Sequence, residues 1–255
     1  MPHKIYLIAN WKMQLNSSES IELAEKILKQ EINQQKTEVI LAASFTSIPE
    51  LSKKIKNTPI KLAAQDISSH DKGQFTGQIS APQLKEWGVE YVIVGHSERR
   101  KFFQETDEQI NLKTKAALAH NIIPIICIGE TLQDRENKMS EVVIIRQLTS
   151  ALQDIQLSKN QKLIIAYEPV WAISPAPPAT PDDAEQNTQM MAHLLRDFFD
   201  EQTIKNQIIT IYGGSADDKN IQSFLDKENI FGALIGGASL DENKFNAMID
   251  ISNKN

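Results

Sequence analysis

Short apolar runs recur along the whole chain and predict eight β-strands. Most of these runs are continuously apolar rather than alternating with polar residues, which is typical of parallel strands covered on both faces. Helical patterns lie between them. We expect strands at Lys4–Ala9, Glu38–Ala42, Ile60–Ala64, Tyr91–Val94, Ile123–Ile128, Leu163–Tyr167, Ile208–Tyr212 and Ala233–Ile235.

Several of the helical stretches open with capping signals. In a capping box, the residue before the helix and the third residue inside it each bond the other's backbone. Pairs with this spacing are Asn16 with Glu19, Ser80 with Gln83, and Thr106 with Gln109. Thr180 precedes a proline and two acids, which also favours a helix start. Apolar residues keep helical spacing from Asp183 to Asp200, so we expect a helix there with its methionines in the core.

Strand–helix units repeated eight times favour one closed (β/α)8 barrel, a TIM barrel, as a single domain over residues 1–255. A doubly wound open sheet is the alternative, but no Gly-x-Gly-x-x-Gly motif follows the first strand. No shift in composition marks a domain boundary, so the (β/α)8 barrel is the fold we predict.

The net charge bears on the partners of this protein, and the cysteine content on its compartment. A formal net charge of −6 argues against nucleic acid, although not against an anionic metabolite. The single cysteine, Cys127, fits a reducing compartment and lies in an apolar run, as a small core residue would. No signal-peptide pattern opens the sequence, and no apolar run approaches the ~18 residues that span a membrane. We therefore expect a cytoplasmic protein without membrane contact.

Polar side chains follow the predicted strands at the end where barrels of this kind carry their active sites. Asn10 and Lys12 follow the first strand, His96 the fourth and Glu168 the sixth. Three of them have a plainer interpretation as well: Lys12 as a solvated lysine, His96 as a hydrogen-bonded core histidine and Glu168 as a surface acid. The other histidines show no ligand spacing, so we expect no metal site.

Glycine pairs follow the seventh and eighth strands. They are Gly213-Gly214, followed by Ser215, and Gly236-Gly237. Glycine lets backbone N–H groups approach an anion closely, and a helix start beyond it adds a favourable dipole. Because these two loops often bind phosphate in barrels, the pairs predict a phosphate site.

Six motifs resemble those of the triosephosphate isomerase family, in order and from end to end of the chain. They are NWKM at 10–13, GHSERR at 95–100, CIGE at 127–130, AYEPVWAI at 166–173, YGGS at 212–215 and IGGASL at 235–240. The resemblance implies cofactor-free interconversion of dihydroxyacetone phosphate and D-glyceraldehyde 3-phosphate, a reaction of glycolysis and gluconeogenesis. Another phosphate-binding barrel enzyme, from tryptophan or histidine biosynthesis for instance, is an alternative.

The resemblance also implies roles for individual residues. Glu168 would remove the proton next to the carbonyl, and His96 would polarise that carbonyl as a neutral imidazole. Lys12 and Asn10 would stabilise the enediolate, with Glu98 holding Lys12 in place. The substrate-binding set would be completed by Ser174, Ser215, Gly236 and Gly237.

The family is usually dimeric through the loop after strand three, which residues 72–78 match, with Thr76 at the tip. Where the family commonly has a glutamate that pairs with the partner's arginine, this chain has Gln78, so the interface ion pair of Arg99 would be missing. Such pairs contribute only ~0–1 kcal/mol, and we still predict a homodimer.

The stretch WAISPAPPATP at 171–181 holds four of the ten prolines. It corresponds to the family's lid, whose usual tip is Gly-Thr-Gly-Lys-Thr-Ala. The lid N–H groups that would matter belong to Ser174, Ala176 and Ala179, and none of these is proline. We expect a functional but stiffened lid. The alternative is an impaired barrel that presents Pro175–Pro178 to a partner protein.

Overall fold

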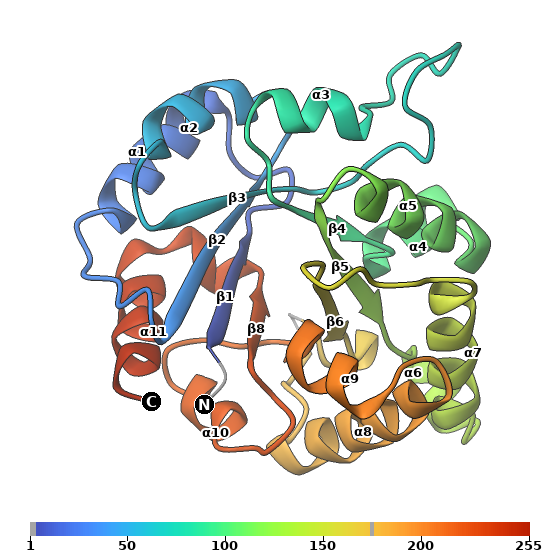
Figure 1. The fold of residues 1–255 in the computed structure, drawn as a ribbon. Helices are drawn as coiled ribbons and strands as arrows, with labels where there is room; N and C mark the ends of the chain where they lie inside the picture. The colour runs from blue at the N-terminus through green and yellow to red at the C-terminus, as the bar shows by residue number, and fades with distance from the viewer. Residues whose placement is uncertain (1–3, 174–175) are drawn as a thin grey trace.

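The chain closes into a barrel of eight parallel strands, in a computed structural model that describes residues 4–173 and 176–255 (Figure 1). The strands follow one another around the barrel in chain order, and the last pairs with the first. The predicted (β/α)8 barrel is confirmed, and each predicted strand end lies within one residue of the observed one. The strands are β1 (Ile5–Asn10), β2 (Thr37–Ala43), β3 (Ile60–Ala64), β4 (Tyr91–Val94), β5 (Ile123–Ile128), β6 (Leu163–Tyr167), β7 (Ile208–Tyr212) and β8 (Gly232–Ile235).

Helices surround the barrel and cover the outer face of its strands (Figure 1). The predicted caps are present: Asn16, Ser80 and Thr106 each precede a helix with the expected capping box. Thr180 is an N-cap as predicted, and it also forms a capping box with Asp183. The α-helices are α1 (Ser17–Ile27), α2 (Ile48–Ile55), α3 (Ala81–Glu86), α4 (Ser97–Phe103), α5 (Asp107–Ala119), α6 (Leu132–Glu136), α7 (Ser140–Leu152), α8 (Pro181–Leu194), α9 (Glu201–Gln207), α10 (Ile221–Leu225) and α11 (Glu242–Lys254). Short 3-10 turns are η1 (Val170–Ala172), η2 (Leu195–Asp197) and η3 (Gly237–Leu240).

The helix expected over residues 183–200 is not continuous. The α-helix α8 ends at Leu194, the 3-10 turn η2 follows, and a separate helix α9 begins at Glu201. Asp200 accounts for the new start, because its carboxylate accepts the backbone N–H of Thr203 at 2.7 Å and so caps α9. Apolar spacing continued across the break, and the competing cap was not recognised in the sequence.

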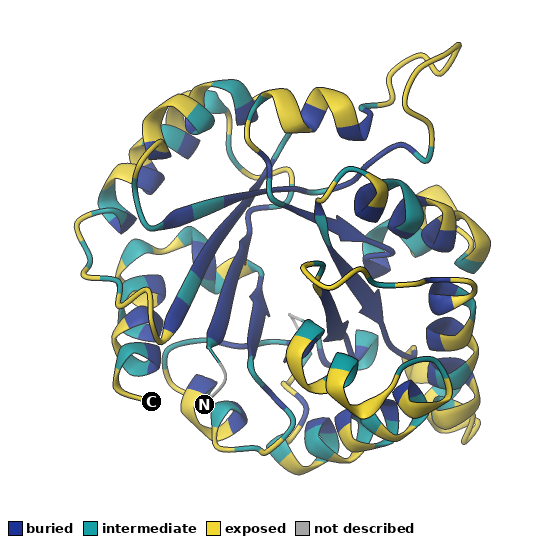
Figure 2. Cartoon of the chain, viewed as in Figure 1, coloured by how far each residue is buried: buried dark blue, intermediate teal, exposed yellow. Residues whose placement is uncertain are grey.

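Figure 2 shows that the strands are buried along most of their length. Their side chains form two core layers, set by the alternation along each strand. On β1, Tyr6 and Ile8 point into the barrel, whereas Leu7 and Ala9 face the helices. Cys127 belongs to the interior layer and is only 1% exposed, as a small core residue would be. Burial raises the pKa of its thiol well above the ordinary value.

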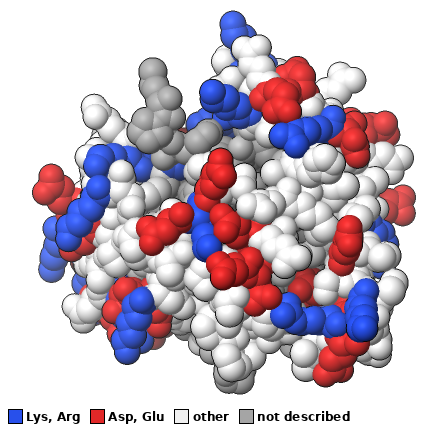
Figure 3. Space-filling model, turned by 90° about the horizontal axis from the view of Figure 1, so that it is seen from below, with Lys and Arg blue, Asp and Glu red and all other residues white. Residues whose placement is uncertain are grey.

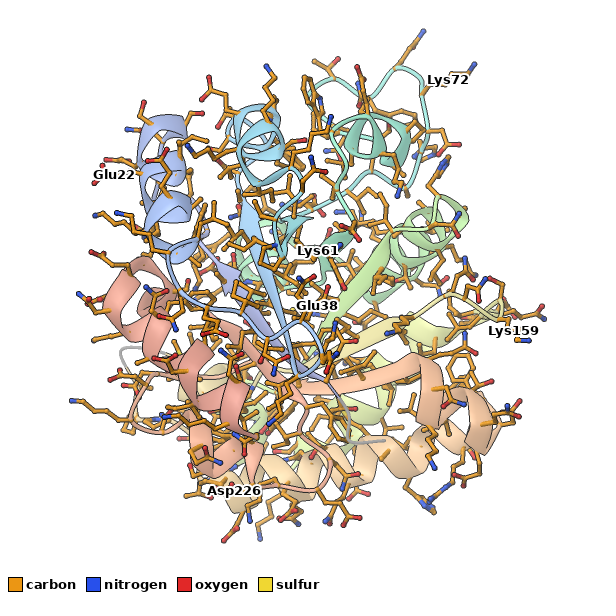
Figure 4. The ribbon with its side chains drawn as sticks, turned by 60° about the vertical axis from the view of Figure 1, so that its left-hand side comes forward. Glu22, Glu38, Lys61, Lys72, Lys159 and Asp226 are labelled. Carbon is orange, nitrogen blue, oxygen red and sulfur yellow. The ribbon has the colours of Figure 1, made fainter. Side chains whose placement is uncertain are left out.

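The surface is charged in a mixed pattern, with one projecting loop. Residues 70–78, between β3 and α3, are all exposed, and this loop stands away from the barrel in Figures 1 and 2. Lys72 lies at its outer end in Figure 4. On the face seen in Figure 3, basic side chains lie among acidic ones and do not gather in one basic patch. Within residues 4–173 and 176–255, no helix is both long and apolar enough to span a membrane.

Candidate active site

A cavity of about 350 Å³ opens at the C-terminal ends of the strands, where the polar side chains were predicted to converge. Its lining includes Asn10, Lys12, His96 and Glu168, together with both glycine pairs and Ser215. Glu98 reaches the same site through Lys12. Ser174 lies outside the described residues. The four side chains predicted to react therefore share one cavity with the predicted phosphate loops.

Glu168 follows β6 directly and is only 2% exposed. Its Oε2 accepts the backbone N–H of Ser97 at 2.9 Å, and its Oε1 accepts the Ser97 hydroxyl at 2.7 Å. His96 Nε2 lies 3.0 Å from the same Oε1. Ser97 was not identified from the sequence, although it stands inside the GHSERR motif at the first position of α4. The buried carboxylate is thus held by donors from a single neighbouring loop.

His96 caps the N-terminus of α4 and is 7% exposed. Its Nδ1 accepts the backbone N–H of Glu98 at 3.3 Å, which leaves the ring proton on Nε2, the nitrogen that faces Glu168. His96 is therefore placed to donate a hydrogen bond from Nε2 toward the cavity.

Lys12 has a left-handed backbone conformation, with φ at 53°. Non-glycine residues adopt this region rarely, and they keep it where their surroundings hold them. Asn10 Oδ1 accepts the Lys12 N–H at 3.1 Å, and Gln65 Nε2 donates to the Lys12 carbonyl at 2.7 Å. The ammonium lies 2.6 Å from Glu98 Oε1. Asn10 and Gln65 thus hold the backbone of Lys12, while Glu98 holds its ammonium group in place. The contribution of Gln65 was not predicted.

The two glycine loops form another part of the cavity wall. They are residues 213–214 and 236–237, and the 3-10 turn η3 begins at the second of these pairs. A Cβ placed on Gly236 would come within 3.4 Å of the Lys12 side chain, so the ammonium lies beside this loop. Lys244 adds a second cation to the lining. Backbone N–H groups, a turn start and two lysines make this wall suited to an anion.

The proline-rich segment is anchored on both sides in the core. Ala172 and Ala179 are buried, at 0% and 3% exposure, whereas Pro177 and Pro178 between them are exposed. The Ser215 hydroxyl donates to the Ala172 carbonyl at 2.9 Å. The N–H of Ala176 donates to the carbonyl of Ile173 at 3.1 Å.

The sequence is similar to the family model described as triosephosphate isomerase over residues 5–252. Curated proteins of that name are similar along almost their whole length. The one from Endomicrobium trichonymphae is 39% identical over 249 residues, covering 98% of this chain and 99% of the relative. The one from Clostridium tetani (strain Massachusetts / E88) is 36% identical over 247 residues, with 97% and 96% covered. The one from Caldanaerobacter subterraneus subsp. tengcongensis is 39% identical over 245 residues, with 96% and 98% covered.

Proposed function

This chain belongs to the triosephosphate isomerase family, and we propose that it interconverts dihydroxyacetone phosphate and D-glyceraldehyde 3-phosphate through an enediolate. One observation carries the proposal: the buried Glu168 carboxylate lies 3.0 Å from Nε2 of His96, in a cavity that also holds Lys12. This arrangement pairs a base with an electrophile. We place the reaction in the cytoplasm, in glycolysis and gluconeogenesis.

The proton transfer needs only side chains of this chain. Glu168 removes the proton from the carbon next to the carbonyl and returns it to the neighbouring carbon, so no cofactor takes part. His96 Nε2–H donates to the substrate oxygen on which negative charge develops, and Lys12 and Asn10 stabilise the same enediolate. Deleting one preorganised donor of this kind raises a barrier by ~3 kcal/mol.

The phosphate of the substrate would occupy the wall made by the two glycine loops. Ser215, Gly236 and Gly237 line the cavity there, and Ser174 is assigned to the same end by its place in the lid. Binding at this end holds the reacting carbons over Glu168, which supplies the orientation that proton transfer requires.

A coupled isomerase assay on the purified protein tests this function. Glu168→Gln keeps the shape of the side chain and removes the base, so turnover should fall by ~10²–10⁴-fold. Glu108→Gln, at an exposed position on α5, is the matched control and should leave turnover unchanged. Near wild-type turnover of Glu168→Gln would refute the assignment of the base.

A homodimer is part of the proposal. The exposed loop 70–78 suits insertion into a second copy. Arg99 has acidic partners in its own chain, with Nη2 at 2.8 Å from Asp66 and Nε at 3.4 Å from Glu105, so its charge does not depend on an acid at position 78. Sedimentation of a monomer at micromolar concentration would contradict the dimer.

The lid is proposed to be functional but stiffened. Because Ala172 and Ala179 are buried on either side of it, replacing residues 174–178 by Gly-Thr-Gly-Lys-Thr leaves both anchors in place. We expect turnover to change only a few-fold. Freeing a residue alters the entropic part of its free energy by ~1–2 kcal/mol, but it does so in both the open and the closed lid, so most of the change cancels. A hundredfold gain would mean that the native lid is defective.

A further inference from the structure

Arg135, on the short helix α6, contacts the chain on both sides of the proline-rich segment. Its guanidinium lies 3.9 Å from the centroid of the Trp171 ring, which belongs to η1. Its Nη2 also lies 3.1 Å from Oδ1 of Asp183, in the first turn of α8. One side chain thus connects the segment that follows Glu168 to the helix that begins beyond the prolines.

Trp171 is held at its edge as well as on its face. The indole N–H donates to Glu130 Oε1 at 2.7 Å, and Glu130 is fully buried at 0% exposure. Tyr167 donates its hydroxyl to the same oxygen at 3.1 Å. With Glu130 fixing the edge and Arg135 covering a face, the ring has little freedom to turn.

The backbone around Trp171 reaches both ends of the active site. Val170 donates its N–H to Glu130 at 3.0 Å, two residues after the catalytic glutamate Glu168. Ala172 accepts the hydroxyl of Ser215, which lines the phosphate end of the cavity, at 2.9 Å. A displacement of the ring would therefore shift the base and the phosphate loop together.

Asp183 supplies the other end of the connection. Its Oδ2 accepts the hydroxyl of Thr180 at 2.7 Å in the capping box of α8, while Oδ1 faces Arg135. Each oxygen thus has its own partner, so the pairing with Arg135 does not compete with the cap. A planar guanidinium can stack on a ring and pair with a carboxylate at once, which the ammonium of lysine cannot do equally well.

We propose that Arg135 is a positioning residue for the isomerase reaction: it fixes the segment from Glu168 to Ala172 by stacking on Trp171 while it pairs with Asp183 at the start of α8. This inference rests on the proposed function. The side chains of Arg135 and Asp183 are 41% and 29% exposed, and ion pairs at such exposure add little to the stability of a fold. The contribution of Arg135 is therefore to the geometry of the site rather than to folding.

The test compares Arg135→Ala and Arg135→Lys with Arg196→Ala. Arg196 makes a similar exposed pair, 2.7 Å from Glu201, in the turn η2 that follows α8 and outside the cavity lining. We expect Arg135→Ala to lower kcat by about tenfold, less than the roughly hundredfold cost of a 1 Å misplacement. Arg135→Lys should recover part of the loss, and Arg196→Ala should keep wild-type kcat.

Hydrogen exchange of the backbone N–H groups of Val170 and Ala172 gives a second readout that needs no isomerase activity. Exchange should speed up in Arg135→Ala and not in Arg196→Ala. If kcat of Arg135→Ala stays within twofold of wild type, the proposal is overturned even if exchange speeds up, because the contacts of Arg135 would then serve the structure alone. If the wild-type protein shows no isomerase turnover, the proposed function fails, and exchange then decides whether Arg135 holds this segment.

Discussion

Gly129→Ala should damage catalysis because Gly129 lies against the backbone of Glu168, the proposed base. A Cβ at this position would lie 1.9 Å from the carbonyl oxygen of Glu168 and 2.5 Å from its carbonyl carbon. Ordinary contact begins at 3.4 Å, so the two chain segments must separate by about 1.5 Å. Gln147 holds Gly129 on its other side, accepting its N–H at 2.9 Å and donating to its carbonyl at 3.2 Å. Much of the shift therefore falls on Glu168.

The structure sets the size of the expected effect. A misplacement of ~1 Å at a reacting group costs about a hundredfold in rate, which corresponds to ~2.7 kcal/mol of barrier. Overpacking of the core should also lower the free energy of unfolding by ~1–3 kcal/mol. We expect kcat of Gly129→Ala, measured per folded molecule in the coupled assay, to fall by about two orders of magnitude.

Gly232→Ala provides the matched control. A Cβ on Gly232 would lie 2.0 Å from the carbonyl oxygen of Tyr6, so the clash is as severe, but Gly232 begins β8 at the end of the barrel away from the cavity. This variant should lose stability while its folded fraction keeps kcat. A kcat of Gly129→Ala within threefold of wild type, or an equal loss in Gly232→Ala, would refute the reasoning.

Two further substitutions and one labelling experiment test separate parts of the structure. Ser97→Ala removes the hydroxyl that donates to Glu168 at 2.7 Å. Since a hydrogen bond to a charged group contributes ~1.5–3 kcal/mol, kcat should fall at least tenfold. Unchanged kinetics would show that the backbone N–H of Ser97 suffices. The Cys127 thiol, buried and with a raised pKa, should react with a thiol reagent only after denaturation, and rapid labelling of the native protein would contradict this. Thr180→Ala should cost ~1 kcal/mol of stability at pH 7. Although burial raises the pKa of Asp183, its hydrogen bonds to Thr180 and to Arg135 outweigh that effect and lower the pKa below 3.8. The stability that these bonds add is present above that pH and is lost as the carboxylate is protonated. Chemical denaturation should therefore show the stability difference between wild type and Thr180→Ala shrinking as the pH falls below 3.8.

The strands and helix starts could be predicted because each depends on residues close together in the chain. Continuous apolar runs suffice for strands buried on both faces, and a capping pair such as Thr106 and Gln109 acts within one turn. The grouping of His96 and Glu168 also followed, since the carboxyl ends of parallel strands meet at one rim of a barrel. The break between α8 and α9 did not, because a favourable cap at Asp200 competed with an apolar pattern that continued past it.

The residues that hold the reactive groups were missed for a different reason. Gln65 reaches the carbonyl of Lys12 from 53 positions away, and Ser97 reaches Glu168 from 71 positions away. A glutamine or a serine carries no periodicity or spacing that announces such a contact. The left-handed conformation of Lys12 was equally hidden, because the surrounding hydrogen bonds impose it on a residue that does not favour it.

The backbone of Glu168, the proposed base, is placed by the hydrogen bonding of the barrel. Glu168 donates its N–H to the carbonyl of Ile128 on β5 at 2.7 Å, and the carbonyl of Tyr167 just before it accepts the N–H of Gly213 after β7 at 2.6 Å. These bonds continue the strand pairing past the ends of the strands. A slip of one residue would turn Glu168 away from the cavity and bring Pro169 toward it, because neighbouring side chains on a strand point to opposite faces. Register between strands therefore decides which side chain faces the substrate, and this ties the chemistry of the site to the closure of the barrel.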